Sequence, residues 1–126
     1  MGRLVEKVQY QGKLMKVVIA FDIDGTVDTS SGPVTVARMK ALADSFANVW
    51  IVSPSGLSPN RRTTDPTKFK EAINGDRVTN LRNVKQAEFE NENVEQMTIY
   101  LYVSDNKDYD AAKQAGFSYI EASQFV

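Results

Sequence analysis

The sequence contains no cysteine and no histidine. The lack of cysteine excludes disulfide bonds, thiolate zinc sites and cysteine nucleophiles. The lack of histidine removes the commonest general base and the usual ligand of transition metals. Any chemistry must therefore depend on carboxylates, hydroxyls, lysines and a hard cation such as Mg²⁺.

Long apolar runs are also missing. None approaches the roughly 20 residues that a helix needs to span a bilayer, and residues 1–16 lack the continuous apolar block of a signal peptide. We therefore expect a cytoplasmic protein without a membrane partner. The net charge of −1 provides no global basic field, so a nucleic-acid partner is not favoured.

The apolar residues that are present predict alternating strands and helices. The 126 residues, 42% of them hydrophobic, are expected to form one domain spanning residues 1–126. Short apolar runs predict strands at 17–21, 49–52, 98–103 and 118–120. Helical spacing predicts helices over 34–46 and 111–117, and a last helical turn near the end of the chain. This alternation favours an α/β, Rossmann-like, mostly parallel sheet with helices on both faces.

Two segments fall outside this alternation. Residues 1–15 are expected to form an N-terminal extension or a hairpin. Residues 54–84 are polar and rich in turn-forming residues, so we expect an insertion that is mostly loop, with one short helix at about 67–73.

Polar side chains stand at the ends of three predicted strands. Asp22 follows the first strand, Ser53 the second, and Ser104 with Asp105 the third. In a sheet of this class, ligands bind outside the carboxyl ends of the strands, where the strand order reverses. The sequence therefore predicts a site at this edge.

Asp22 and Asp24 are two residues apart at a strand end, and this spacing directs both side chains to one side. Gly25 permits a sharp turn there, and Thr26 offers a hydroxyl to a substrate. Two carboxylates this close do not both ionise comfortably in a half-buried crevice. A divalent cation resolves the conflict, and Asp105 could be a further ligand, so the pattern predicts Mg²⁺.

Three motifs carry a family resemblance. The stretch "FDIDGTV" resembles the first motif of the haloacid dehalogenase (HAD) superfamily, and "VWIVS" is similar to the second. The stretch "IYLYVSDNKDYDAAKQAGF" resembles the fourth. The resemblance implies a HAD-like fold and a Mg²⁺-dependent phosphatase that forms an aspartyl-phosphate.

The resemblance also implies roles for individual residues. Asp22 would be the nucleophile, and Asp24 the general acid and base, with its main-chain carbonyl on Mg²⁺. Ser53 would donate a hydrogen bond to a phosphoryl oxygen. Asp105 would bind the cation, which shields the nucleophile and the phosphate from each other.

The fourth motif departs from the family pattern, which places a second acidic residue four positions after the first. Position 109 is tyrosine here, whereas Asp108 and Asp110 lie three and five positions after Asp105. Counting back from "AAKQAG" favours Asp108, and in that register Ser104 takes the first position. The metal ligand is therefore expected to be Asp105, Asp108 or both.

The family also uses a lysine close to the aspartyl-phosphate. Lys85 is the favoured candidate, because it precedes Asp105 by 20 residues at the apparent start of a helix. Lys68 and Lys70 are the alternatives.

The segments after the first and second motifs are short, so we expect no sizeable cap domain. An open site suits a phosphorylated small molecule or an exposed phosphate end, or a homodimer in which the partner covers the site. One alternative is a nucleic-acid 3′-phosphatase, with Arg61 and Arg62 as phosphate-binding residues. Another is a non-catalytic binding module that kept the fold.

Overall fold

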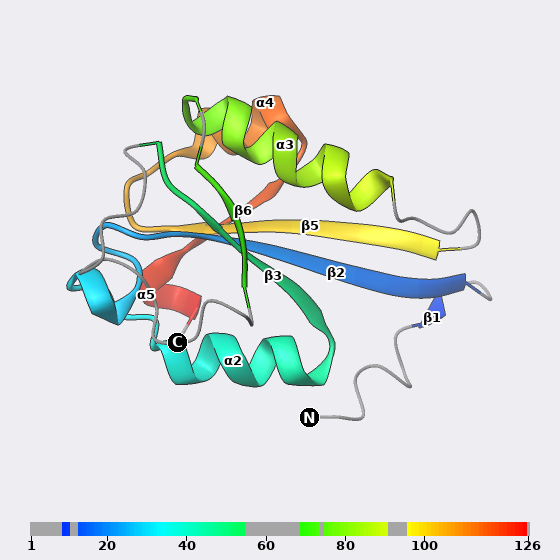
Figure 1. The fold of residues 1–126 in the computed structure, drawn as a ribbon, viewed down its shortest axis with the longest axis horizontal. Coiled ribbons are helices and arrows are strands. Elements are labelled where there is room, and N and C mark those ends of the chain that lie inside the picture. The colour runs from blue at the N-terminus through cyan, green and yellow to red at the C-terminus, as the bar shows by residue number, and fades with distance from the viewer. Residues whose placement is uncertain (1–8, 11–12, 55–68, 74, 91–95, 126) are drawn as a thin grey trace.

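A parallel sheet forms the centre of the molecule (Figure 1). The computed structural model describes residues 9–10, 13–54, 69–73, 75–90 and 96–125. Five strands pair in parallel in the order β4-β3-β2-β5-β6, and a short β1 pairs with β2 in antiparallel orientation. The strands are β1 (Gln9–Tyr10), β2 (Lys13–Asp22), β3 (Ala47–Val52), β4 (Lys70–Ala72), β5 (Gln96–Ser104) and β6 (Ser118–Glu121).

Helices cover both faces of the sheet, as Figure 1 shows. One face carries α2 (Val36–Ser45) and α5 (Ala122–Phe125), and the other carries α3 (Arg77–Phe89) and α4 (Tyr109–Ala115). Between β2 and α2 the chain forms only the short turn η1 (Asp28–Ser30) and a bridge from Val27 to Val34. The predicted Rossmann-like α/β architecture is confirmed.

The apolar run of β2 serves both layers of the core. Val17, Ile19 and Phe21 pack on the side of α2 and α5, whereas Val18 and Ala20 pack on the side of α3 and α4. Side chains of a strand alternate between the two faces, so a strand covered on both sides must be apolar throughout. This is why β2 has a continuous apolar run rather than an alternating pattern.

The pairing register brings the polar strand ends to one edge. Asp22 pairs with Val52 of β3, and Phe21 pairs with Val103 of β5. Asp22 and Ser104 are therefore level across neighbouring strands, and Ser53 follows directly after β3. Strands β3 and β4 lie on one side of β2, with β5 and β6 on the other, so the strand order reverses between β2 and β5. This is the position at which such sheets bind ligands.

The 54–84 segment differs from the prediction. The predicted short helix at 67–73 is wrong where the structure describes it, because Lys70–Ala72 is the edge strand β4. Helix α3 begins at Arg77, inside the segment predicted as loop, and Lys85 is its ninth residue rather than its start. The side chain of Asp76 caps this helix by accepting a hydrogen bond from the Thr79 main-chain N–H at 2.8 Å. The helix buries polar residues as well as apolar ones, so its apolar periodicity is weak.

The far end of α3 is fixed by a buried ionic network around Glu88, which is 1% exposed. Its carboxylate accepts hydrogen bonds from Trp50 Nε1 at 2.7 Å and from Asn48 Nδ2 at 3.0 Å. Lys16 Nζ lies 2.8 Å from Oε1. Burial raises the pKa of Glu88, but Lys16, Trp50 and Asn48 together outweigh burial and hold the pKa below its ordinary value.

We predict that Glu88→Gln lowers the free energy of unfolding by roughly 1–3 kcal/mol, because Lys16 loses a buried counter-charge. Trp50 is the only tryptophan, so urea denaturation followed by its fluorescence measures the change. The exposed neighbour Glu90 provides a matched control as Glu90→Gln, which should leave stability unchanged. Equal midpoints for Glu88→Gln and wild type would contradict the prediction.

The same pair of proteins tests the pKa of Glu88. Because its folded-state pKa is depressed, its stabilising contribution is fully present above the ordinary glutamate pKa and is lost as the pH falls through the folded-state value. The stability difference between wild type and Glu88→Gln should therefore shrink over that acidic range. A difference that stays constant with pH would show that the charge of Glu88 is not responsible.

Candidate active site

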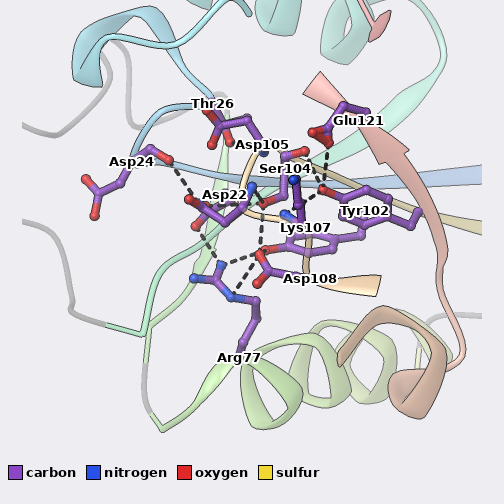
Figure 2. A network of polar contacts seen from close by, with 12 residues as sticks. Asp22, Asp24, Thr26, Arg77, Tyr102, Ser104, Asp105, Lys107, Asp108 and Glu121 are labelled. Atoms are coloured by element: carbon purple, nitrogen blue, oxygen red, sulfur yellow. Dashed lines mark hydrogen bonds and ion pairs between the residues drawn. The ribbon is translucent and has the colours of Figure 1, made fainter. Parts of the chain in front are cut away.

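Asp22 lies at the centre of a polar network where β2 ends (Figure 2). The residue is only 2% exposed. Its Oδ1 accepts a hydrogen bond from Arg77 Nη1 at 2.7 Å, and its Oδ2 accepts one from Asn106 Nδ2 and lies 3.5 Å from Ser104 Oγ. Burial raises the pKa of Asp22, and Arg77 and Asn106 offset this only in part.

Arg77 is the cation of this network, and sequence reasoning missed it. As the first residue of α3, it points from the helix start toward the sheet edge. Its Nη1 donates to the Tyr102 hydroxyl at 2.6 Å as well as to Asp22, and its Nε lies 3.2 Å from Asp108 Oδ2. The available signal was Asp76, whose capping pattern with Thr79 marks a helix start just before Arg77.

Asp108 is the second carboxylate that the network neutralises. Its Oδ2 accepts hydrogen bonds from Ser104 Oγ at 2.9 Å and from the Tyr102 hydroxyl at 3.1 Å. Burial raises the pKa of Tyr102, and the negative charge of Asp22 raises it further, so the hydroxyl stays protonated as a donor. Asp22 and Asp108 are thus joined through Arg77 and Ser104.

Asp105 lies on the Thr26 side of the cluster (Figure 2). Its main-chain N–H donates to Thr26 Oγ1 at 3.1 Å, and Thr26 is fully buried. Gly25 has φ +72°, and a Cβ there would lie 2.7 Å from both carboxylate oxygens of Asp105. Ser104, the last residue of β5, lies between Asp22 and Asp108, with its Oγ 3.5 Å from Asp22 Oδ2 and 2.9 Å from Asp108 Oδ2.

Two oxygen atoms of the cluster, Asp22 Oδ2 and the main-chain carbonyl oxygen of Asp24, are suitable ligands for a hard cation. Asn106 Nδ2 donates both to Asp22 Oδ2 and, at 3.1 Å, to the main-chain carbonyl of Asp24. A carboxylate oxygen and a carbonyl oxygen therefore converge on one position, and both are ligand types that Mg²⁺ uses. Figure 2 shows the Asp24 carbonyl facing the cluster while its carboxylate points away.

The four aspartates predicted as ligands (Asp22, Asp24, Asp105 and Asp108) are not gathered into one acidic group. In the part of the chain that the structure describes, no three acidic side chains lie close enough to hold a metal ion. The fit to a cation therefore depends on the Asp22 carboxylate oxygen together with the main-chain carbonyl oxygen of Asp24.

Lys85 lies elsewhere on α3. Its Nζ is 5.0 Å from the centre of the Tyr100 ring, and it lies against Gly116 at the end of α4. Eight residues separate it from Arg77, which is about 12 Å along a helix. The structure thus brings Arg77, and not Lys85, to Asp22.

Of the other residues predicted for the site, Ser53 lies at the same edge of the sheet as Asp22, whereas Lys70 and Asp110 are not among the described residues that contact Asp22. Ser53 is buried at the sheet edge, and its main-chain N–H donates to the Ala72 carbonyl at 3.3 Å. Lys70 lies with its Nζ 5.5 Å from the centre of the Trp50 ring, and Asp110 is exposed in the first turn of α4. Three other candidates lie outside the described residues: Arg61, Arg62 and Lys68.

Comparisons with models of protein families, with curated proteins and with solved structures find no match to this chain. Its chemistry is therefore inferred from the geometry of the site. None of the described helices has the length and apolar character needed to cross a membrane.

We predict that Tyr102→Phe lowers the free energy of unfolding by roughly 1–3 kcal/mol, because it removes a buried partner of Arg77 and of Asp108. The measurement is urea denaturation followed by Trp50 fluorescence. Tyr109→Phe is the matched control, because Tyr109 is 52% exposed, and it should change the midpoint little. A Tyr102→Phe midpoint equal to that of wild type would show that the hydroxyl contributes nothing.

Proposed function

We propose that the protein is a Mg²⁺-dependent phosphatase that hydrolyses phosphoric monoesters through an aspartyl-phosphate on Asp22. The observation that carries this proposal is the buried Asp22 carboxylate at the reversal of strand order, with the Arg77 guanidinium 2.7 Å away. Guanidinium groups bind phosphate oxygens in a bidentate manner, so a nucleophile and a phosphate-binding cation are already neighbours. The HAD resemblance assigns the same role to Asp22.

The proposed reaction transfers the phosphoryl group twice, first from the substrate to Asp22 and then from Asp22 to water. In the first, an Asp22 oxygen bonds to phosphorus, the bond from phosphorus to the ester oxygen breaks, and Asp24 protonates the departing alcohol. In the second, Asp24 takes a proton from water as the water oxygen bonds to phosphorus. The bond between phosphorus and Asp22 breaks, which restores the Asp22 carboxylate and releases inorganic phosphate. The Asp24 side chain is exposed and its carboxylate points away from the cluster, so it would have to rotate to reach the ester oxygen.

Two atoms of the chain would hold the cation: the carboxylate of Asp22 and the main-chain carbonyl of Asp24, which converge near Asn106. When bound, Mg²⁺ supplies positive charge that shields the carboxylate from the incoming phosphate. Ser53, buried beside Asp22 at the sheet edge, would donate a hydrogen bond to a phosphoryl oxygen.

Arg77 would fill the role that the family gives to a lysine. It lies at the start of the helix that precedes β5, the strand of the fourth motif, and it contacts the proposed nucleophile directly. Its charge would stabilise the phosphoryl oxygens as Asp22 attacks.

The described residues favour no particular substrate. The 3′-phosphatase alternative depends on Arg61 and Arg62, which lie outside the described residues. A small phosphate ester is therefore the appropriate first substrate.

We predict that Asp22→Asn, which keeps the shape and removes the nucleophile, lowers turnover of p-nitrophenyl phosphate by on the order of 10³-fold or more. Activity of the wild type should disappear with EDTA and return with Mg²⁺. Asp44→Asn, an exposed change on α2, is the matched control and should keep wild-type turnover. Full Mg²⁺-dependent activity in Asp22→Asn would exclude Asp22 as the nucleophile, and a wild type without turnover would favour the non-catalytic binding module.

We predict that Arg77→Met lowers kcat by about 10²–10³-fold, because it removes the charge that stabilises the phosphoryl group. Arg77→Lys should retain more activity than Arg77→Met, because the lysine ammonium keeps the positive charge. It should remain below wild type, because an ammonium lacks the planar guanidinium that donates two parallel hydrogen bonds. Steady-state kinetics with saturating Mg²⁺ measures both, with circular dichroism to verify folding. Equal kcat in Arg77→Met and wild type would restrict Arg77 to a structural role.

A further inference from the structure

We propose that Asn106 supplies the third protein ligand to the cation, through its side-chain carbonyl oxygen, in the place where a carboxylate would be expected. The inference rests on the proposed function and identifies how this chain completes that site. It replaces Asp105 and Asp108, the ligands that the sequence favours.

The position of the Asn106 side chain is the first argument. Its terminal nitrogen is within hydrogen-bonding distance of Asp22 Oδ2 and of the Asp24 carbonyl, the two oxygens that converge there. The side-chain NH2 group of Asn106 has two hydrogens and donates one to each oxygen. The end of an asparagine side chain carries an oxygen and a nitrogen of nearly equal size, so a half-turn exchanges them. After that half-turn, the Asn106 side-chain oxygen lies beside the Asp22 and Asp24 oxygens, so one cation could bind all three.

The backbone around Asn106 is held in place from both sides. The Asn106 main-chain N–H donates to Ser104 Oγ at 3.1 Å. The next residue, Lys107, has φ +54°, and its N–H donates to the Tyr119 hydroxyl at 3.1 Å. That hydroxyl in turn donates to the Ser104 carbonyl at 2.7 Å. A left-handed conformation is unfavourable for lysine, so these contacts hold a turn that aims Asn106 at Asp22.

The two carboxylates expected as ligands are engaged elsewhere. Asp108 Oδ2 is contacted by Arg77, Tyr102 and Ser104. The Asp105 carboxylate packs against Gly25, and its main-chain N–H is bonded to Thr26. The side chain that reaches the oxygens of both Asp22 and Asp24 is Asn106.

A neutral ligand has a measurable consequence. Asparagine oxygens bind hard cations, but the charge count of the ligands tunes affinity. With Asp22 as the one charged ligand and Arg77 beside it, the site should bind its cation more weakly than a site with two carboxylates. Replacing Asn106 by aspartate should therefore tighten binding.

The test measures binding without turnover. Mn²⁺ is titrated into the intact protein in the absence of substrate, free Mn²⁺ is followed by electron paramagnetic resonance, and Mg²⁺ is added as a competitor. We expect Asn106→Ala to weaken Mn²⁺ binding by roughly tenfold or more and Asn106→Asp to tighten it by roughly tenfold. A gain in affinity cannot arise from misfolding, so Asn106→Asp keeps the test valid if Asn106→Ala is unstable.

Asp105→Asn tests the rival ligand, and we expect it to weaken Mn²⁺ binding less than Asn106→Ala does, because the Asp105 carboxylate packs against Gly25 rather than contacting Asp22. Asp44→Asn, an exposed change on α2, is the matched control and should leave Mn²⁺ affinity unchanged. Loss of binding in Asp105→Asn, with unchanged binding in both Asn106 variants, would overturn the assignment of Asn106 and leave the phosphatase proposal intact. A wild type that binds neither Mn²⁺ nor Mg²⁺ would instead remove the metal-dependent function itself.

Discussion

The negative charge of Asp22, buried where β2 ends, is the constraint on which the surrounding structure depends. A carboxylate that is 2% exposed is costly unless charge and hydrogen bonds compensate it. The compensation comes from Arg77 at the start of α3, from Ser104 at the end of β5 and from Asn106 just after that strand. The start of α3 and the turn after β5 must therefore be positioned accurately, and the sheet register determines where they meet.

Much of this arrangement could be predicted from the sequence. The apolar runs identify β2, β3 and β5, and parallel pairing of such strands brings Asp22, Ser53 and Ser104 to one edge. The structure confirms that juxtaposition. Strand β4 could not be predicted, because three residues at an exposed edge, two of them charged, carry no apolar pattern.

The contacts of the site were harder to predict, for two physical reasons. Side chains alternate along β5, so Tyr102 and Ser104 share a side and the next residue, Asp105, does not follow them. Asp105 was expected at the site because its side chain is acidic. The alternation of side chains along β5 instead places Ser104 on the side that faces Asp22. Arg77 was missed because its helix has a weak apolar stripe, and only the Asp76 cap marks where the helix begins.

Helix α3 is fastened to the sheet at both ends by oppositely charged residues. Arg77 is bonded to Asp22 at one end, and Glu88 is bonded to Lys16 and Trp50 at the other. The two anchors are eleven residues apart, about 16 Å along the helix axis. A shift or rotation of α3 would break the contacts at both ends of the helix. The contacts of Glu88 therefore help to fix the distance between the Arg77 guanidinium and Asp22. Changes at Glu88, Lys16 or Trp50 could consequently move Arg77 relative to Asp22 from the opposite end of the helix.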